Sequence, residues 1–475
     1  MTKTIFGTAG IRKKFTQDFS GPQWLEIGMA IGTYLGKNSS VLIGRDTRKT
    51  AELVQYAIIS GLVSCGCEVY VLQGSAESPY VTTSSMAYAT KHFDADAGIQ
   101  VTASHNTPEY IGIKIWQKTG MGFTPAQEEA IDQIYTMKNF RLAQWNEIIK
   151  VKYISNANDI HIKAILDRIH APIDFKGKKV TVAVDPGNGA ACEIAPTMLQ
   201  KLGVNVVTIN AQPDGLFPGR DSEPNDINLR TLLRMMNNDS EMDLGIAYDG
   251  DADRVRFIDR KGVLIEGDRI LLFLAFYCSD KEKRSPVIVT PVNSSTALDD
   301  VLKAKGISVS RTRIGDIPVA IRAQEINARL GGEISGTYTW PGFHLGPDAL
   351  YTTAKLLEIT AINGGSFENL LDKIPQYHVI HDNLELDETR FKKVADIDME
   401  PAVISFLKEK KIAVIETNKI DGILARFSQG FLLVRLSGTS PTIRLSCEHK
   451  DKAIATSLLK GIRAKIEKEI LGDHE

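Results

Sequence analysis

Residues 40–72 read SVLIGRDTRKTAELVQYAIISGLVSCGCEVYVL, and this stretch decides the fold class. Its ends, Ser40 to Ile43 and Glu68 to Leu72, are short apolar runs of the kind that form buried strands. Between them, Glu52 to Ser64 has the spacing of apolar residues that predicts an amphipathic helix, and another such helix is predicted at Gln23 to Leu35. This alternation is typical of an α/β layer with a largely parallel sheet.

The same order of strand, turn and helix recurs twice along the chain. Residues 179–185 (KVTVAVD) lead into the turn 186–189 (PGNG) and a helix. Residues 286–290 (PVIVT) lead into the turn 291–294 (PVNS) and another helix. Three such openings predict three similar α/β domains in one chain.

The last hundred residues have a different pattern. Two β-rich runs, Ile423 to Phe427 and Phe431 to Leu436, flank a turn, and a charged helix is predicted over Asp451 to Ile470. This pattern predicts a smaller α+β domain. Polar joints are expected near 154–159, 259–267 and 364–377. The predicted domains are 1–155, 156–260, 261–373 and 374–475.

Size and composition limit the classes of function. A chain of 475 residues exceeds one ordinary core, and its 43% apolar and 24% charged content is typical of a globular protein. The net charge of -2 gives no electrostatic footprint for nucleic acid or an anionic membrane, so an anionic ligand needs a local site. No secretory leader or membrane-length apolar run stands out, and we expect a cytoplasmic protein.

A serine at the end of a strand is the first candidate for chemistry. Thr102-Ala-Ser-His-Asn106 follows the apolar strand Ala97 to Val101, so that the Ser104 hydroxyl lies beside an imidazole and an amide. This arrangement suits a nucleophile, although the pentapeptide alone is equally compatible with a plain polar turn. Lys114 could carry a proton or contact a phosphate, or it could be a solvated surface lysine.

An acidic turn is the second candidate. In Asp249-Gly-Asp-Ala-Asp-Arg254, three carboxylates at alternate positions can converge on one hard divalent cation. A calcium loop of the EF-hand type is excluded because its sixth and twelfth positions are Arg254 and Arg260. An aspartyl-phosphate phosphatase lacks support because Asp253 stands where its motif needs a hydroxyl. A bland acidic turn remains the alternative.

Two further turns could bind parts of a sugar phosphate. Arg435-Leu-Ser-Gly-Thr-Ser-Pro441 combines a guanidinium, hydroxyls and a glycine that exposes backbone N–H groups, which together suit a phosphate. Gly332-Glu-Ile-Ser-Gly336 offers a carboxylate and a hydroxyl for sugar hydroxyl groups. A structural loop is the alternative for each.

Taken together and in this order, these segments resemble the α-D-phosphohexomutase superfamily, which includes phosphoglucomutase, phosphomannomutase and phosphoglucosamine mutase. The resemblance runs from end to end. The stretches that carry it are Phe6–Arg12, Gly44–Arg48, Thr102–Asn106, Asp185–Gly189, Pro213–Gly219, Asp249–Arg254, Gly315–Asp316, Gly332–Gly336 and Arg435–Pro441.

The resemblance implies a four-domain architecture, with three α/β domains and a C-terminal α+β domain around a central cleft. It implies a phosphosugar mutase, an isomerase that interconverts hexose 1-phosphate and hexose 6-phosphate. The intermediates would be an enzyme phosphoserine and a hexose 1,6-bisphosphate, which is also the activator. The implied cofactor is one Mg²⁺ per chain. The implied partner is a small phosphosugar, with no nucleic acid or membrane, and the chain would be a monomer or a homodimer.

The resemblance also assigns roles to residues. Ser104 would carry the phosphoryl group and Lys114 would be the general acid and base. The other residues around that phosphate would be Arg12, His105 and Arg254. The metal ligands would be Asp249, Asp251, Asp253 and a phosphoserine oxygen of Ser104. The substrate-binding residues would be Gly315, Asp316, Glu333, Ser335, Arg435, Ser437, Gly438 and Thr439.

Some positions depart from the family pattern. Thr337 stands where the family commonly has His, and Leu436 and Ser440 replace Pro and Glu. The sugar loop and the later His344-Leu-Gly-Pro-Asp348 resemble a phosphoglucosamine mutase branch, while the C2 substituent of the substrate stays open. The enzymatic alternative is a kinase or phosphatase that uses the acidic turn and Mg²⁺ with a different phosphoryl donor, and the absence of a P-loop motif argues against a P-loop kinase. A phosphosugar-binding regulator on the same fold is the non-enzymatic alternative.

Overall fold

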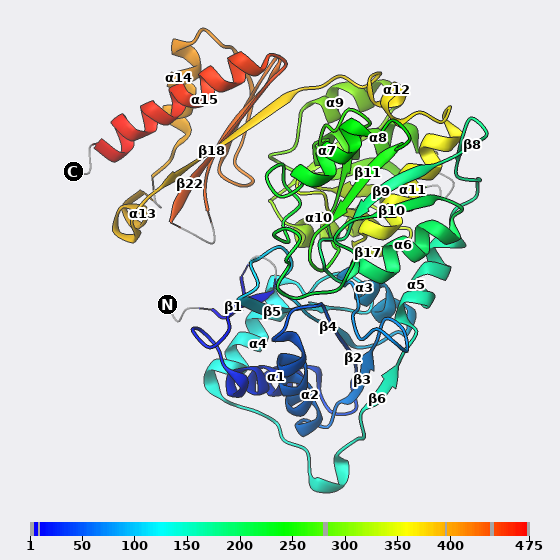
Figure 1. Ribbon diagram of the computed structural model, residues 1–475. Helices are drawn as coiled ribbons and strands as arrows, with labels where there is room; N and C mark the ends of the chain where they lie inside the picture. The colour runs from blue at the N-terminus through cyan, green and yellow to red at the C-terminus, as the bar shows by residue number, and fades with distance from the viewer. Residues whose placement is uncertain (1–3, 8–9, 279–283, 395–396, 438–440, 473–475) are drawn as a thin grey trace.

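The computed structural model describes residues 4–7, 10–278, 284–394, 397–437 and 441–472. These residues form four main β-sheets and a two-stranded hairpin (Figure 1). The hairpin pairs β7 (Asp174–Phe175) with β8 (Lys178–Lys179). Within the described ranges, no helix combines the length and the apolar character needed to cross a membrane.

The first sheet has the strand order β1-β5-β4-β2-β3-β6. Strands β4, β2, β3 and β6 run parallel, whereas β5 pairs antiparallel with both β4 and β1. Its strands are β1 (Ile11–Lys14), β2 (Ser40–Arg45), β3 (Glu68–Leu72), β4 (Ala97–Val101), β5 (Tyr110–Trp116) and β6 (Lys152–Ile154). Its helices are α1 (Gly21–Leu35), α2 (Ala51–Ser64), α3 (Thr83–His92) and α4 (Pro125–Met137). The predicted strand, helix and strand between residues 40 and 72 are therefore confirmed.

The second sheet has the order β10-β9-β11-β12, with an antiparallel strand at one edge. Its strands are β9 (Thr181–Asp185), β10 (Asn205–Thr208), β11 (Leu244–Tyr248) and β12 (Val255–Ile258). Helices α5 (Ala157–Leu166), α6 (Ala191–Lys201) and α7 (Arg230–Asn238) belong to this part of the chain. The strand predicted over 179–185 begins at Thr181, because Lys178 and Lys179 belong to the separate hairpin.

The third sheet has the order β14-β13-β15-β16-β17 and ends in two antiparallel strands. Its strands are β13 (Ser285–Pro291), β14 (Ser308–Thr312), β15 (Ala328–Gly332), β16 (Tyr338–Trp340) and β17 (His344–Pro347). Its helices are α8 (Gly267–Tyr277), α9 (Ala297–Leu302), α10 (Asp316–Glu325), α11 (Ala349–Ile362) and α12 (Phe367–Leu371). One continuous apolar core joins the second and third sheets.

The fourth sheet is wholly antiparallel, in the order β18-β22-β21-β20-β19, and stands apart with its own core (Figure 1). Its strands are β18 (His378–Glu385), β19 (Val414–Asn418), β20 (Ile423–Phe427), β21 (Gly430–Leu436) and β22 (Thr442–His449). Its helices are α13 (Glu388–Val394), α14 (Glu400–Glu409) and α15 (Lys452–Ile466). Three α/β layers and an α+β region confirm the predicted fold class, whereas the domain limits stay predictions.

One expected joint contains a helix, and one predicted helix needs correction. The polar joint expected at 364–377 contains α12, because Phe367, Leu370 and Leu371 are buried in the core of the second and third sheets. The helix expected over 451–470 is α-helical only to Ile466 and then continues as a π-helical turn over Glu467–Leu471. In the first case the tertiary core supplies the driving force that a short polar segment lacks.

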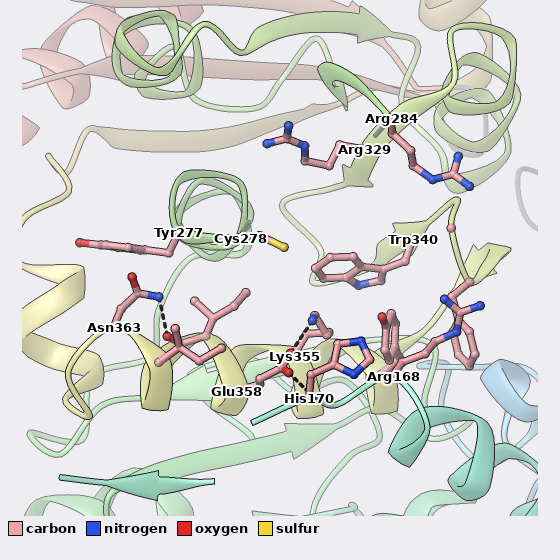
Figure 2. Close-up of a pocket in the computed structure, with 15 residues that line it drawn as sticks. Arg168, His170, Tyr277, Cys278, Arg284, Arg329, Trp340, Lys355, Glu358 and Asn363 are labelled. Atoms are coloured by element: carbon pink, nitrogen blue, oxygen red, sulfur yellow. Dashed lines mark hydrogen bonds and ion pairs between the residues drawn. The ribbon is translucent and has the colours of Figure 1, made fainter. Parts of the chain in front are cut away.

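A pocket of about 220 Å³ lies at one end of the third sheet (Figure 2). Its described lining comes from the end of α8, from β15 and β16, from α11 and from the segment that follows α5. Arg329, near the start of β15, and Trp340, at the end of β16, are on its wall.

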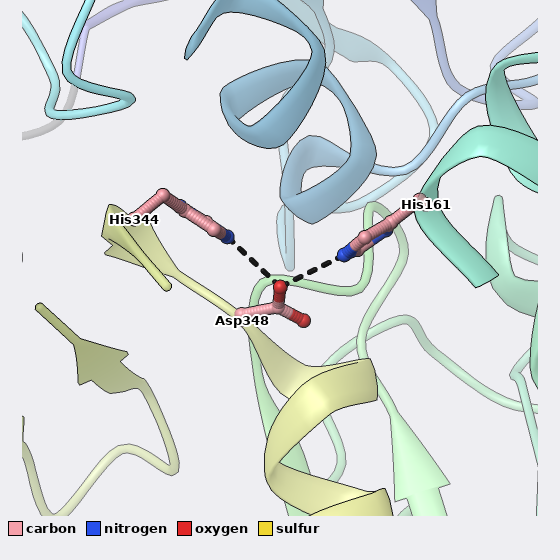
Figure 3. A group of neighbouring side chains, drawn as sticks. All are labelled: His161, His344 and Asp348. Atoms are coloured by element: carbon pink, nitrogen blue, oxygen red, sulfur yellow. Dashed lines mark hydrogen bonds and ion pairs between the residues drawn. The ribbon is translucent and has the colours of Figure 1, made fainter. Parts of the chain in front are cut away.

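A buried hydrogen-bonded cluster joins distant parts of the chain (Figure 3). His161 Nε2 of α5 and His344 Nε2 of β17 each lie 2.9 Å from Asp348 Oδ2. The Gly346 N–H donates to His344 Nδ1 at 3.1 Å, so His344 is the tautomer that donates from Nε2. Ser85 of α3 bonds the other nitrogen of His161 at 2.9 Å. The ring nitrogens are thus satisfied by protein groups, and the cluster ties α3 and α5 to the third sheet.

Candidate active site

The serine loop begins where β4 ends and places Ser104 in the protein interior. Ser104 has a φ of 50°, a left-handed conformation that a residue other than glycine adopts where its surroundings hold it. Its backbone N–H donates to Thr102 Oγ1 at 2.8 Å, and that hydroxyl donates to Asp46 Oδ2 at 2.7 Å. These bonds fix the backbone of the turn that carries the Ser104 hydroxyl.

A buried arginine holds the same loop from the other side. The guanidinium of Arg48 donates to four backbone carbonyl groups at 2.6–3.1 Å. These carbonyls belong to Ser104, Asn106, Thr107 and Tyr110. Asp46 accepts from the Arg48 backbone N–H and lies 3.3 Å from its Nε. The sequence marked Gly44–Arg48 only as a family stretch, and the role of Arg48 was missed.

The acidic turn between β11 and β12 meets the serine loop. The Ser104 hydroxyl donates to Asp249 Oδ2 at 2.8 Å, although the two residues are far apart in sequence. A Cβ added at Gly250 would lie 2.7 Å from the Ser104 carbonyl oxygen, so the approach requires glycine. Two segments predicted independently therefore form one site.

The three aspartates of this turn form a compact group that could hold a metal ion. Asp249, Asp251 and Asp253 are buried, and each offers an oxygen within 4.8 Å of the others. Burial, together with the charges of Asp253 and Asp251, raises the pKa of Asp249 well above its usual range. Among the described residues, Asp251 Oδ1 and Asp253 Oδ1 have no hydrogen-bond partner. Crowded, buried carboxylate oxygens of this kind fit a hard divalent cation such as Mg²⁺.

Lys114 of β5 faces the acidic turn. Its Nζ donates to Asp251 Oδ2 at 2.8 Å and also to Asp253 Oδ2. Burial disfavours the charged lysine, but these two carboxylates outweigh it and raise the pKa of Lys114. Burial likewise opposes ionisation of Asp251, but Lys114 and the Thr83 hydroxyl lower its pKa. Lys114 is thus a charged ammonium group within the site and not a solvated surface lysine.

Two arginines and a histidine lie in or beside the serine loop. Arg12 Nη1 donates to Asn106 Oδ1 at 3.3 Å, and burial and the charge of Arg254 lower the pKa of Arg12. The Arg254 guanidinium donates to both carboxylate oxygens of Glu223, at 3.2 and 3.1 Å. Glu223 was not predicted from the sequence.

His105 is the third of these neighbours. Its Nδ1 lies 3.3 Å from Ser104 Oγ. Burial, with the charges of Arg254 and Arg12, lowers the pKa of His105 to about 2, so its imidazole is neutral. A neutral ring can exchange hydrogen bonds with the serine without adding charge.

The loop between β15 and β16 presents Glu333. Its Oε1 accepts from the Gly315 N–H at 3.0 Å, and its Oε2 accepts from the Ser335 hydroxyl at 3.1 Å. Burial and the nearby Asp316 raise the pKa of Glu333 to about 7. The Gly336 carbonyl accepts from Val255 N at 3.0 Å, which docks the loop beside the acidic turn. The structure thus brings Glu333, Ser335, Gly315 and Asp316 together.

The last predicted loop is only partly described. Arg435 is the next-to-last residue of β21, and the Ser437 N–H donates to the Thr442 carbonyl at 2.9 Å. Gly438 and Thr439 lie outside the described residues. Within the described part of the chain, no hydrogen bond or ion pair joins Arg435 to the Ser104 group. Burial lowers the pKa of Arg435, with the nearby Arg444 acting in the same direction and Asp421 against it.

Comparison with known proteins agrees with this geometry. Models of the phosphoglucomutase/phosphomannomutase alpha/beta/alpha domains I, II and III match residues 3–142, 159–262 and 266–377. A phosphoglucomutase/phosphomannomutase of Thermococcus kodakarensis is 38% identical over 96% of this chain and 97% of its own length. The chain belongs to this family, within the α-D-phosphohexomutase superfamily. It is therefore an enzyme of the phosphosugar mutase class.

Other phosphohexomutase relatives support the same membership. A probable phosphoglucosamine mutase of Methanococcoides burtonii is 37% identical over 94% of this chain and 96% of its own length. A solved family member from Burkholderia thailandensis superimposes with a TM-score of 0.82, covering 98% of this chain and 97% of that one at 24% identity. The second comparison shows the shared fold alone.

In this phosphohexomutase a second arginine, Arg220, holds the start of the acidic turn. Arg220 Nη2 donates to the Tyr248 carbonyl at 2.6 Å, directly before Asp249, and its Nε lies 3.0 Å from Asp185 Oδ2. The Ser222 hydroxyl donates to the carbonyls of Ser104 and Asn106 at 3.3 and 3.1 Å. The sequence marked Asp185–Gly189 as a family stretch but did not predict Arg220.

We expect Arg48→Lys to disorder the serine loop. Lysine lacks the guanidinium fork, so buried carbonyls lose donors, and the free energy of unfolding should fall by about 2–4 kcal/mol. Arg45→Lys, at the end of β2 and paired with exposed Glu52, should cost about 1 kcal/mol or less. Denaturant unfolding of the two variants measures this change. Equal losses of unfolding free energy in the two variants would contradict the role of Arg48 in holding the serine loop.

Proposed function

We propose that this phosphohexomutase moves a phosphoryl group between O1 and O6 of a hexose monophosphate and uses Ser104 as the carrier. The observation that carries the proposal is the buried Ser104 hydroxyl, 2.8 Å from Asp249 and within a ring of acidic and cationic side chains. A buried serine in that setting is suited to covalent phosphoryl transfer. The alternative of a non-catalytic phosphosugar-binding regulator lacks support, because Ser104 and all three aspartates of the acidic turn are present.

The carboxylates of Asp249, Asp251 and Asp253 would hold one Mg²⁺. When bound, the cation would supply positive charge against the phosphoryl oxygens and relieve the repulsion among the aspartates. A phosphoserine oxygen at Ser104 would complete this side of the site. The two aspartate oxygens without hydrogen-bond partners support this assignment.

Phosphoryl transfer needs few covalent events. The bond between phosphorus and Ser104 Oγ breaks as a sugar hydroxyl oxygen bonds to phosphorus, and the hydroxyl proton leaves for a basic group. In the return step the sugar phosphate gives its phosphoryl group back to Ser104. Arg12 and Arg254 would stabilise the charge that spreads over the phosphoryl oxygens. The ammonium group of Lys114 would donate a proton to Ser104 Oγ as its bond to phosphorus breaks. The amine that remains would be the basic group that accepts the proton of the sugar hydroxyl.

The intermediate would be a hexose 1,6-bisphosphate, which must turn over within the site between the two half-reactions. Arg435 and Ser437 would hold the phosphate that is not being transferred, together with Gly438 and Thr439. One such phosphate site can serve both orientations if the fourth sheet moves as a unit, and its separate core supports this motion. Exclusion of water would protect the phosphoserine from hydrolysis.

The substrate class follows from the sugar loop. Glu333 and Ser335 would bind sugar hydroxyl groups. No residue in the described part of the chain is assigned to bind the C2 substituent of the sugar. Coupled assays of the purified protein on glucose, mannose and glucosamine 1-phosphates test the proposal. Turnover of at least one, with dependence on hexose 1,6-bisphosphate, is the expected result. The absence of turnover on all three would contradict it. The cytoplasmic location and the monomer or homodimer state stay predictions.

We expect discrimination against a galacto sugar. If Glu333 accepts from the equatorial O3 and O4 hydroxyls, an axial O4 loses one charge-assisted hydrogen bond, which costs about 1.5–3 kcal/mol. The kcat/KM for galactose 1-phosphate should then be about 10- to 100-fold lower than for the gluco and manno sugars. Glu333→Gln should narrow this difference. Equal rates on all three sugars would mean that Glu333 does not read O4.

A further inference from the structure

The turn that joins β19 to β20 connects the fourth sheet to the third. Two of its residues, Ile420 and Asp421, accept hydrogen bonds from the segment between β14 and α10. The Ile314 backbone N–H donates to Asp421 Oδ2 at 3.1 Å, and Arg313 Nε donates to the Ile420 carbonyl at 3.1 Å. Each bond spans 107 residues of sequence. These bonds fix where this part of the fourth sheet lies against the third.

The next residue of the same segment holds the sugar-loop carboxylate. The Gly315 N–H donates to Glu333 Oε1 at 3.0 Å. Gly315 has a φ of 133°, a conformation that favours glycine. Only the φ and ψ of Ile314 separate its own N–H from that of Gly315, because peptide planes are rigid. A displacement of the Ile314 N–H therefore moves the donor that holds Glu333.

The same turn lies against the arginine that is predicted to bind a phosphate. A Cβ added at Gly422 would lie 2.4 Å from Arg435 Cβ, so the turn can approach this strand only with glycine at that position. Burial lowers the pKa of Arg435, and the negative charge of Asp421 opposes this shift. Asp421 is thus near Arg435 and also bonded to the segment that holds Glu333.

We propose that Asp421 is a positioning residue that couples the fourth sheet to the sugar loop. Its carboxylate fixes the Ile314 N–H, and through it the Gly315 N–H that holds Glu333. The inference rests on the proposed function, in which Arg435 binds the phosphate that is not transferred and Glu333 binds sugar hydroxyl groups. Binding energy gained at that phosphate then helps to orient Glu333, the group that selects the sugar.

Hydrogen exchange of the Gly315 amide tests the coupling without any substrate. Asp421→Ala removes the acceptor of the Ile314 N–H but leaves Glu333, the acceptor of the Gly315 N–H, in place. We expect the Gly315 amide to exchange about tenfold or more faster in this variant than in the wild-type protein, measured by mass spectrometry at single-residue resolution. Asp421→Asn keeps an acceptor oxygen in a side chain of the same shape and should exchange at the wild-type rate.

Arg426→Gln is the matched control for a general loosening of the fourth sheet. Arg426 lies on β20, and its Nη2 donates to Asp300 Oδ1 of α9 at 3.3 Å, so the change breaks another contact between the same two parts of the chain. The Gly315 amide should exchange at the wild-type rate in this variant. Wild-type exchange in Asp421→Ala, or equal acceleration in Arg426→Gln, would overturn the proposal.

Sugar selectivity provides the catalytic readout. The ratio of kcat/KM for glucose 1-phosphate to that for galactose 1-phosphate does not depend on the fraction of folded enzyme, so a purely structural loss leaves it unchanged. We expect Asp421→Ala to narrow this ratio by about fivefold or more, and Arg426→Gln to preserve it. An unchanged ratio in Asp421→Ala would overturn the proposal. A wild-type protein without turnover on any hexose phosphate would instead contradict the proposed function, and the exchange of the Gly315 amide would still decide the coupling.

Discussion

Ser104→Ala should reduce steady turnover by about 10⁴-fold or more. The hydroxyl that we propose as the carrier of the phosphoryl group is absent, and the remaining groups cannot form the covalent intermediate. The wild-type protein should show an added phosphate by intact mass, and the variant should not. Folding should survive, because within the described part of the chain the Ser104 hydroxyl hydrogen-bonds only to the side chains of Asp249 and His105.

A neighbouring serine provides the control for this experiment. Ser222→Ala removes a hydroxyl that donates to the Ser104 carbonyl and leaves the Ser104 side chain in place. This variant should still carry the phosphate and retain turnover within about tenfold, because it loses only neutral hydrogen bonds. If Ser104→Ala kept full activity, or if the phosphate mapped to another residue, the proposed carrier would be wrong.

Removal of magnesium should have the second-largest effect. Treatment with a chelator should lower turnover by about 10²-fold or more, because the phosphoryl oxygens lose their main positive partner. Asp251→Asn should mimic it, since one anionic ligand becomes a neutral amide of the same shape. Magnesium should also raise the melting temperature of the wild-type protein through binding to the folded state, and Asp251→Asn should weaken this shift.

Asp259→Asn is the matched control for the metal experiment. Asp259 directly follows β12, the strand that begins after the acidic turn. Its Oδ1 accepts from the backbone N–H groups of Lys261 and Val263 at 2.9 Å. An asparagine oxygen can keep both bonds, and Asp259 is outside the acidic group. The magnesium affinity of the Asp259→Asn variant should equal that of the wild-type protein. Full activity of the chelated wild-type protein would leave the acidic turn without a catalytic role.

The sequence specified the local parts of the site well, because each part is a strand end followed by a short turn. Ser104 follows β4, and the turn of Asp249 to Arg254 lies between β11 and β12, as the apolar runs predicted. The Ser104 to Asp249 bond spans 145 residues, and only the resemblance to a family suggested it. The roles of Arg48, Arg220 and Glu223 were missed because their partners are backbone carbonyls or side chains distant in sequence.

By itself, the sequence determined the α/β class, the antiparallel last region and the residue types available for chemistry. Apolar periodicity and turn residues act over a few positions, so they can be read without knowing the contacts. The tertiary structure alone decided that α12 would form in an expected joint, and that His344 and Asp348 would serve a buried cluster with His161. It also decided that Lys114 is buried against Asp251 and Asp253. Burial and long-range pairing set these properties, and neither is encoded in any single stretch of the chain.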